Sequence, residues 1–476
     1  MITRRAAIGG LATTLIGLTG RATAQGAAQG TAQGSQPSPA IEGQKGNGPG
    51  WNVTAKPRKM RLLPDASREA DLWTFNGRLA PAFRIKHGAE VRLSLINEAP
   101  QPLSLHFHGV RGPNDMDGVG GFSFHALRNS ADGRGVFTQE PVWPGQRFDY
   151  LFTPPDPGTF LIRPCILGKS AEPMERGLSG LLVVEETNPP EVDQDIALLV
   201  DDWALADDGS LALGDPAPAG RLGSVLTANG KPAPQRIEAA PGGRVRLRLA
   251  NACNARIMRL GLEGLNACVI AVDGQPSSTF EPLKASLPFA PGNRYDLLVD
   301  LPRETGSAGT VSALIGNGFP LLEIVAAGDR REPLRPVAPL PANPRLPEAI
   351  RLQSAARKDV AITGDPRRPD APWAVNGAQG QPSNPPLVKV GRGTPVVLAL
   401  RNETGYVQPL HLHGHAFRLL HALDDGWEPY WLDTVQVPEN KTVRIAFVAD
   451  NPGKWLLAST VMERFDAGLW TWIEVS

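Results

Sequence analysis

The sequence predicts an all-β protein made of three consecutive β-sandwich domains, and three observations lead to this prediction. The chain has 476 residues, which at roughly 150 residues per domain suggests three domains. It contains 51 Gly and 46 Pro, a turn-rich composition, and 41% hydrophobic residues that can form cores. One strand-like phrase occurs three times, and its closing residues Asn97, Asn251 and Asn402 are 154 and 151 residues apart.

The first 24 residues have the pattern of a secretory signal peptide. Arg4 and Arg5 precede an apolar run over 6–20, and Ala22-Thr23-Ala24 forms a small-residue cleavage site. The paired arginines favour twin-arginine export, with ordinary export as the alternative. We expect a periplasmic protein with no transmembrane segment in the mature chain. Residues 25–50 are rich in Gly, Gln, Ala and Ser, which predicts a flexible linker.

The three copies of the repeated phrase are HGAEVRLSLIN (87–97), PGGRVRLRLAN (241–251) and GRGTPVVLALRN (391–402). Each alternates apolar and other residues, which predicts a strand of an antiparallel sheet with one buried face. A second phrase follows each copy, at 143–152, 290–299 and 437–447. Together with a Pro-rich stretch over 331–348, the repeats predict domains at 51–187, 188–345 and 346–476.

The charge balance excludes one class of partner. Lys and Arg total 48, as do Asp and Glu, so no basic surface for nucleic acid is expected from bulk charge. The sequence also lacks a phosphate-binding loop, a CxxC pair and a nucleophile–base triad. With eight His and three Cys in the chain, any metal site must draw on a short list of ligands.

Two histidine motifs occupy matching places in the first and last copies of the repeat. LHFHG contains His106 and His108, and QPLHLHGHAF contains His411, His413 and His415. Alternate residues of a strand share one face, so each His-x-His pair can aim both imidazoles the same way. The symmetry favours a metal site. The alternative is that these histidines are packed, hydrogen-bonded residues at a domain interface.

These motifs resemble the multicopper oxidase family, which includes laccases and bacterial cuprous oxidases. The resemblance extends over about 51–476 and also rests on PNDMDGV (113–119), DPGTF (156–160), GLSGLLVVEE (177–186), ANGK (228–231) and the DNPGKWLL and AGLWTWIEV phrases of 450–475. It implies three cupredoxin-like Greek-key β-sandwich domains. In that family a type 1 copper takes electrons from the substrate, and a trinuclear cluster between the first and third domains reduces oxygen.

The resemblance implies roles for some residues and losses at others. His106 and His411 match type 2 copper ligands, and His108 and His413 match type 3 ligands. His415 matches a histidine that is not ordinarily a ligand, and Leu469 lies within family variation. The remaining ligand positions are occupied by other residues: Arg163, Cys165, Gln408, Ala458, Ser459, Thr460 and Arg464.

These departures predict that the protein has no type 1 copper and no intact trinuclear cluster. Gln408, Ser459 and Arg464 supply neither thiolate nor imidazole, and a guanidinium repels a copper ion. What remains is a site for one copper, or one zinc, at His106, His108, His411 and His413, or no metal at all. Asp117 matches a family acid near the type 2 copper, and Cys165 could add a sulfur ligand.

Two hypotheses about function follow. In the first, the protein is an exported, non-catalytic binding or scaffold protein, similar to the copper-free cell-division members of the family. It would then act on an unidentified periplasmic protein in cell-envelope or division stress, as a monomer. In the second, it is a metalloprotein or oxidoreductase with one residual type 2-like copper or zinc at the two His-x-His pairs.

Three further features leave alternatives open. Cys253 and Cys268 form either a disulfide after export or two buried thiols. His125 lies in a long loop, 121–137, which is either a lid or binding surface or a tolerated insertion. His87 and His421 occupy ordinary turn and strand positions.

Overall fold

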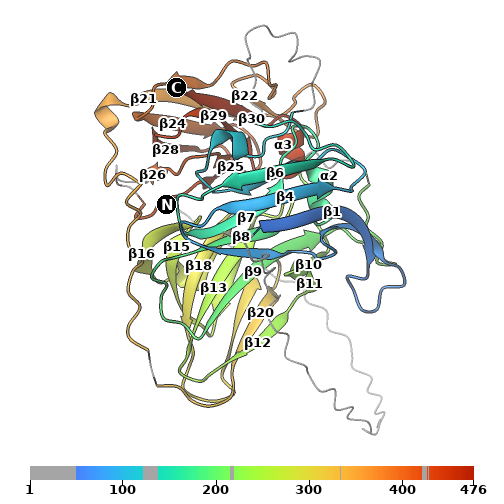
Figure 1. Ribbon diagram of the computed structural model, residues 1–476, viewed down its shortest axis with the longest axis vertical. Helices are drawn as coiled ribbons and strands as arrows, with labels where there is room; N and C mark the ends of the chain where they lie inside the picture. The colour runs from blue at the N-terminus through green and yellow to red at the C-terminus, as the bar shows by residue number, and fades with distance from the viewer. Residues whose placement is uncertain (1–49, 122–137, 215–218, 333, 421–425, 427) are drawn as a thin grey trace, which may run out of the picture. The chain divides into compact units, whose positions relative to one another are not determined.

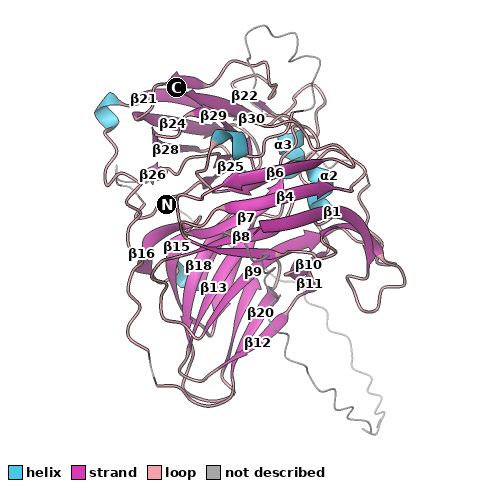
Figure 2. Ribbon diagram, viewed as in Figure 1, coloured by secondary structure: helices cyan, strands magenta, loops and turns pink. Residues whose placement is uncertain are grey.

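The computed structural model describes residues 50–121, 138–214, 219–332, 334–420, 426 and 428–476 (Figure 1). These residues belong to one compact unit, Ser35–Ser476. Strands dominate it and the helices are short, which confirms the all-β class (Figure 2). The predicted signal peptide (1–24) and nearly all of the predicted linker (25–50) lie outside the described residues. No helix among the described residues is long and apolar enough to cross a membrane.

The first domain is a pair of four-stranded sheets with the orders β2-β1-β4-β6 and β3-β8-β7-β5. One core cluster contains residues of both sheets, such as Leu93 of β4 and Leu182 of β8, so the two sheets face each other. The elements are β1 (Gly50–Met60), β2 (Ala70–Phe75), β3 (Ala82–Lys86), β4 (Val91–Asn97), β5 (Leu105–His108), η1 (Asn114–Met116), β6 (Arg147–Phe152), β7 (Gly158–Pro164), α2 (Ala171–Glu175) and β8 (Gly180–Glu185).

The second domain has a seven-stranded sheet, β11-β10-β9-β13-β18-β15-β16, and a five-stranded sheet, β12-β20-β19-β14-β17. Its elements are β9 (Gln194–Trp203), β10 (Val225–Ala228), β11 (Lys231–Pro232), β12 (Gln235–Ala239), β13 (Arg244–Asn251), β14 (Met258–Glu263), β15 (Asn266–Val272), β16 (Gln275–Phe280), η2 (Leu283–Ala285), β17 (Ser286–Phe289), β18 (Arg294–Asp300), β19 (Ala308–Ala313) and β20 (Phe319–Ala326).

The third domain has two five-stranded sheets, β22-β21-β24-β28-β26 and β23-β30-β29-β25-β27. Its elements are η3 (Leu352–Ser354), β21 (Ala356–Thr363), β22 (Ala374–Val375), β23 (Val388–Val390), β24 (Thr394–Asn402), β25 (Gln408–Leu412), β26 (Arg418–Leu420), β27 (Thr434–Val437), β28 (Thr442–Ala449), β29 (Gly453–Ser459), α3 (Met462–Asp466) and β30 (Trp470–Val475). The strands therefore fall into three consecutive sets. The boundaries between the domains, 187/188 and 345/346, remain predictions from the sequence.

The two repeated phrases turn out to be neighbouring strands. β4, β13 and β24 carry the first phrase, and each pairs antiparallel with the strand of the second phrase, β6, β18 or β28. The predicted antiparallel pairing therefore holds on one side of each of these strands, but on the other side each pairs parallel with β1, β9 or β21, so the sheets are mixed. In all three domains an intervening strand belongs to the opposite sheet, so the chain crosses over and returns in its original direction.

Strand β13 was predicted to have one buried face, but both of its faces are buried. Its apolar residues are buried, but Arg244, Arg246 and Arg248 on the other face are buried too. Arg246 and Arg248 both reach the carboxylate of Asp296, at 2.6 and 3.0 Å. Glu186, which follows the last strand of the first domain, accepts two further bonds from Arg246. The face that would otherwise meet solvent is covered by paired charges.

Candidate functional site

The structure brings together the two predicted His-x-His pairs, although they are about 300 residues apart in sequence. His106 and His108 lie on β5, and His411 lies on β25 with His413 just beyond its end. All four side chains are buried. Ligand atoms of His106, His108 and His411 lie within 4.8 Å of one another. The site therefore joins the first and third domains.

His106 and His411 face each other through their Nε2 atoms, 3.4 Å apart. His106 Nδ1 lies 2.7 Å from the carbonyl oxygen of Asp117, and His411 Nδ1 lies 2.9 Å from that of Asp433. A carbonyl oxygen only accepts, so each Nδ1 carries a proton, and the neutral form of each ring has its lone pair on Nε2. Two lone pairs that face each other at this distance repel unless a cation lies between them.

The other two histidines stack against this pair and keep one nitrogen available. The ring of His413 stacks on His106 at 3.9 Å and donates its Nδ1–H to Asp117 Oδ2 at 2.8 Å, which leaves its Nε2 lone pair free. The ring of His108 stacks on His411 at 3.7 Å, and its Nε2 lies 3.0 Å from Thr434 Oγ1. His108 Nδ1 is buried without a hydrogen-bond partner among the described residues.

Burial and neighbouring positive charges lower the pKa values of His108, His411 and His413. Burial lowers the pKa of His411 to about 4, despite the neighbouring carboxylate of Asp433. The pKa of His108 is lowered by burial, then by His411 and Arg163, and the pKa of His413 by burial and then by His106. Neutral imidazoles are the form that binds metal ions. The site therefore offers lone pairs at neutral pH.

Two buried carboxylates, those of Asp117 and Asp433, contact nitrogen atoms of the four imidazole rings. Asp117, the predicted partner of the site, contacts both His106 and His413. Burial alone would raise its pKa, but His413 and His106 hold the pKa of Asp117 below its ordinary value. Asp433 plays the same part for His108 and His411, at 3.5 and 3.2 Å.

Sequence reasoning missed Asp433 and the residue that fixes it, Arg294 of the second domain. Arg294 Nη1 and Nη2 donate to the two carboxylate oxygens of Asp433, at 3.0 and 2.5 Å. Its Nε donates to the carbonyl oxygen of Thr159 in the first domain. Burial opposes the charge of Asp433, but Arg294 outweighs it and lowers the pKa of this carboxyl. The only hint in the sequence was that Arg294 lies in the second repeated phrase.

Arg163 lies on the strand next to the site, directly across from His106 in the register of β5 and β7. It is buried, and its Nε has no hydrogen-bond partner among the described residues. Burial lowers the pKa of Arg163 to about 10, so the guanidinium stays charged at neutral pH. Cys165 is buried in an apolar cluster with Ala458 and is absent from the donor groups found among the described residues.

The position that the resemblance assigned to a type 1 copper is filled by a different set of contacts. Arg464 Nη1 donates to Gln408 Oε1 at 2.8 Å and to the carbonyl oxygen of Val407 at 2.7 Å. Its guanidinium also stacks on Trp373 and Tyr406, at 5.3 and 5.2 Å. Amide, hydroxyl and guanidinium groups do not fit a copper site that requires thiolate and imidazole.

The four histidines, in contrast, do suit a metal ion. Nitrogens 3.4 Å apart can both bind one copper or zinc ion at about 2 Å, with an angle near 116° between the bonds. The residues therefore fit one ion. They do not fit a further copper beside Arg163, because a buried cation there would repel it.

The remaining candidates are separate from this site. Cys253 and Cys268 are free, which excludes the disulfide in this structure, and Cys268 is only half-buried because it lies on β15 near its exposed end. His125 with 122–137, and His421, lie outside the described residues. His87 occupies a turn, as expected, and belongs to none of the candidate metal-binding groups found among the described residues.

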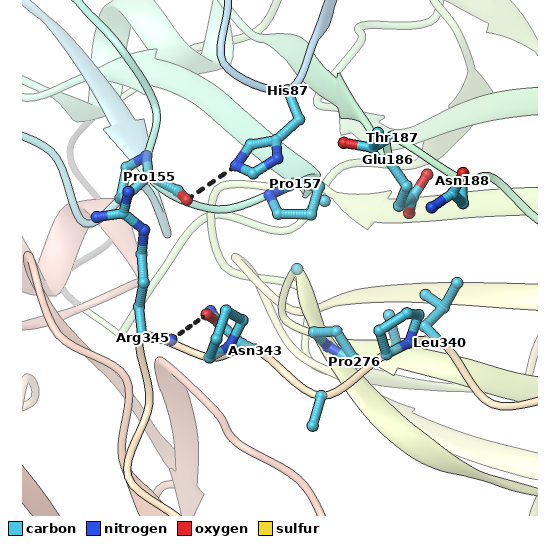
Figure 3. Close-up of a pocket in the computed structure, with 16 residues that line it drawn as sticks. His87, Pro155, Pro157, Glu186, Thr187, Asn188, Pro276, Leu340, Asn343 and Arg345 are labelled. Carbon is cyan, nitrogen blue, oxygen red and sulfur yellow. Dashed lines mark hydrogen bonds between the residues drawn. The ribbon is translucent and has the colours of Figure 1, made fainter.

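His87 also lines a separate pocket of about 230 Å³, shown in Figure 3. Its Nε2 lies 3.1 Å from the carbonyl oxygen of Pro155. On the opposite wall, Asn343 accepts a bond from the backbone N–H of Arg345 (Figure 3). Asn343 also donates to Asp156 and Gln275, so its side chain holds the wall together.

Parts of the chain match known family profiles, and the whole fold is similar to a solved structure. Two family profiles, both described as multicopper oxidase, match residues 57–130 and 341–476. The structure of a multi-copper oxidase from Pseudomonas thermotolerans is 30% identical, with a TM-score of 0.77, over 90% of this chain and 98% of that one.

Two curated relatives are similar over most of their length. The multicopper oxidase MmcO of Mycobacterium tuberculosis is 28% identical over 79% of this chain and 77% of its own. The cell division protein FtsP of Dickeya dadantii is 27% identical over 80% of this chain and 79% of its own. The fold, the profiles and the 30% identical structure together show that this chain belongs to the multicopper oxidase family.

Proposed function

We propose that this protein is a non-oxidase member of its family that acts by binding a protein partner in the periplasm, in cell division or envelope stress. The observation that supports it is the contact between Arg464 and Gln408. The resemblance assigns this position to a type 1 copper, which requires thiolate and imidazole ligands, so a guanidinium bound to an amide there supports the absence of that copper. The similarity to proteins named FtsP supports the division context.

A genetic experiment tests this role. Under envelope stress, cells in which the gene is deleted should grow as filaments or as chains of unseparated cells, and the wild-type gene should restore normal division. A His106→Ala/His411→Ala variant should restore it equally, because a binding role does not need a metal ion. Normal division of the deletion strain under stress would contradict the proposal. So would rescue by the wild-type gene but not by the histidine variant when both proteins are present at the same level.

A biochemical measurement accompanies it. Purified protein loaded with copper should consume no oxygen with phenolic or cuprous substrates, while a family oxidase treated in parallel does. It should also show no blue thiolate-to-copper absorption band, since Ser459 and Gln408 replace the required ligands. Oxygen consumption or a blue absorption band would each contradict the inference that the protein has no type 1 copper.

The second candidate is a metalloprotein with one copper or zinc ion, and the facing Nε2 atoms of His106 and His411 favour it. When bound, either ion would supply Lewis acidity, and copper would also supply a one-electron couple. His106 and His411 would hold it, His108 would supply a third nitrogen ligand, and Asp117 and Asp433 would orient the rings.

Metal analysis after loading with copper and zinc separates the candidates. One equivalent in the wild type, retained in His87→Ala and lost in His106→Ala/His411→Ala, would establish the site. No bound metal after loading and dialysis would eliminate this candidate.

A further inference from the structure

The pocket beside His87, of about 230 Å³, lies between the two segments that connect the domains (Figure 3). One wall comes from the first domain and from 186–188, which follow its last strand, β8. The opposite wall contains 340–345, which lie between β20 of the second domain and η3 of the third. None of the four histidines of the candidate metal position lines this pocket. It is therefore a separate site.

Small residues bound the pocket where the first and second domains meet. Gly158 and Gly274, one from each domain, are both part of the lining. A Cβ atom added to Gly158 would overlap the carbonyl oxygen of Gly274, so the two backbones are in contact. Ala271 beside them contributes only a methyl group. Backbone and small side chains thus close the pocket here and leave its space to a ligand.

Hydrogen bonds fix both walls in place. Asn343 Nδ2 donates to Asp156 Oδ1 and to Gln275 Oε1, both at 2.8 Å. Asp156 and Gln275 are buried, so these bonds tie the connecting segment to the first and second domains. On the other wall, His87 Nε2 donates to the carbonyl oxygen of Pro155 at 3.1 Å. A pocket that is already formed loses little conformational freedom when a ligand enters.

The apolar part of the lining consists largely of proline rings. Pro155 and Pro157 belong to the wall of the first domain. Pro276 and Leu340 lie on the opposite side of the pocket (Figure 3). The volume of 230 Å³ is below the roughly 300 Å³ at which pockets for drug-sized ligands begin. Flat apolar walls around so small a space suit one planar ring.

The charged lining residues favour an anion. They are His87, Glu186 and Arg345. Glu186 accepts two bonds from Arg246, at 2.9 and 2.6 Å, so its charge is already balanced. Arg345 is exposed at one end of the pocket, and its guanidinium has no partner among the described residues (Figure 3). A free guanidinium at the edge of an apolar pocket matches a carboxylate, which it can bind through two parallel hydrogen bonds.

We propose that this pocket binds a small aromatic carboxylate, with its ring between the proline-lined walls and its carboxylate on Arg345. Such a ligand would touch both connecting segments and hold them together. This binding depends neither on the protein partner nor on the metal ion proposed above.

The test is a titration of the purified protein with para-fluorobenzoate, followed by fluorine NMR. The acid should bind, and para-fluorobenzamide and fluoroacetate should each bind at least about tenfold more weakly, because the amide lacks the charge and fluoroacetate lacks the ring. Arg345→Gln should weaken binding of the acid by a similar factor. The control is Arg335→Gln, an exposed arginine of the same connecting segment outside the pocket, which should leave binding unchanged.

No binding at millimolar para-fluorobenzoate would overturn the proposal. Unchanged affinity in Arg345→Gln, or equal affinity for the amide, would overturn it as well, since the charge would then be irrelevant. A second variant, Ala342→Leu, narrows the pocket from an exposed position and keeps Arg345. It should lose binding while its unfolding temperature stays near that of the wild type. Undiminished binding by this variant would place the ligand elsewhere and refute the assignment to this pocket.

Discussion

Replacing Glu175 by Gln should stabilise the protein at high pH and leave it almost unchanged at low pH. Glu175 lies on α2 with 3% of its surface exposed. Its Oε1 accepts the backbone N–H of Ala204 at 3.2 Å. Burial, with a further contribution from Asp202, raises the pKa of Glu175 from 4.5 to about 8. The folded protein therefore keeps this carboxyl protonated in a range where the unfolded chain ionises it.

The size of the effect follows from that shift. Below pH 4.5 the carboxyl is protonated in both states and imposes no penalty. Between pH 4.5 and 8 the free energy of unfolding falls as the unfolded chain loses the proton, and above pH 8 the full penalty remains. A shift from 4.5 to about 8 corresponds to about 5 kcal/mol. Gln is neutral at every pH and can keep the bond to Ala204, so it removes this penalty.

Thermal unfolding at pH 5 and pH 9 measures the difference. With unfolding entropies typical of a chain this long, 5 kcal/mol raises the midpoint by roughly 5 °C at pH 9, and the rise at pH 5 should be far smaller. The control is Glu172→Gln on the same helix, which is exposed and pairs with Arg176. An equal rise at both pH values, or a rise in the control, would refute the argument that burial of Glu175 is responsible.

Two further predictions concern the second domain. Asp296→Asn leaves Arg246 and Arg248 buried without that carboxylate and should cost about 3–5 kcal/mol in urea unfolding, whereas Asp149→Asn at an exposed position should cost little. Equal costs would show that the buried network contributes nothing special. A thiol reagent should label one cysteine per native chain, the half-buried Cys268, and three after unfolding. Burial raises the pKa of this thiol, so labelling should accelerate above pH 9, and rapid labelling of all three native thiols would contradict the described burial.

Much of the fold was predictable because it depends on local patterns. Val91, Leu93 and Leu95 alternate with polar residues, and a strand with one face in a core needs that alternation. Repetition of the pattern in the second and third domains gave the number of sandwiches. The His-x-His spacing placed two rings on one strand face for the same reason.

Whether two neighbouring strands run parallel or antiparallel could not be predicted from residue alternation. β4 and β1 run parallel only because the intervening β3 belongs to the opposite sheet, and the alternation within a strand carries no information about that crossover. The same limit applies to Arg246 and Arg248. Alternation marks their face as the polar one, but it cannot say that Glu186 of the first domain and Asp195 of the neighbouring strand β9 cover it.

The sequence by itself determined the three-domain all-β class, the family, and the four histidines as the candidate metal position, because each is encoded in short-range spacing. Only the tertiary structure decided how those histidines are held. Asp433 and Arg294 come from different domains and meet only when these are packed, so their pairing is a long-range contact that no local pattern encodes.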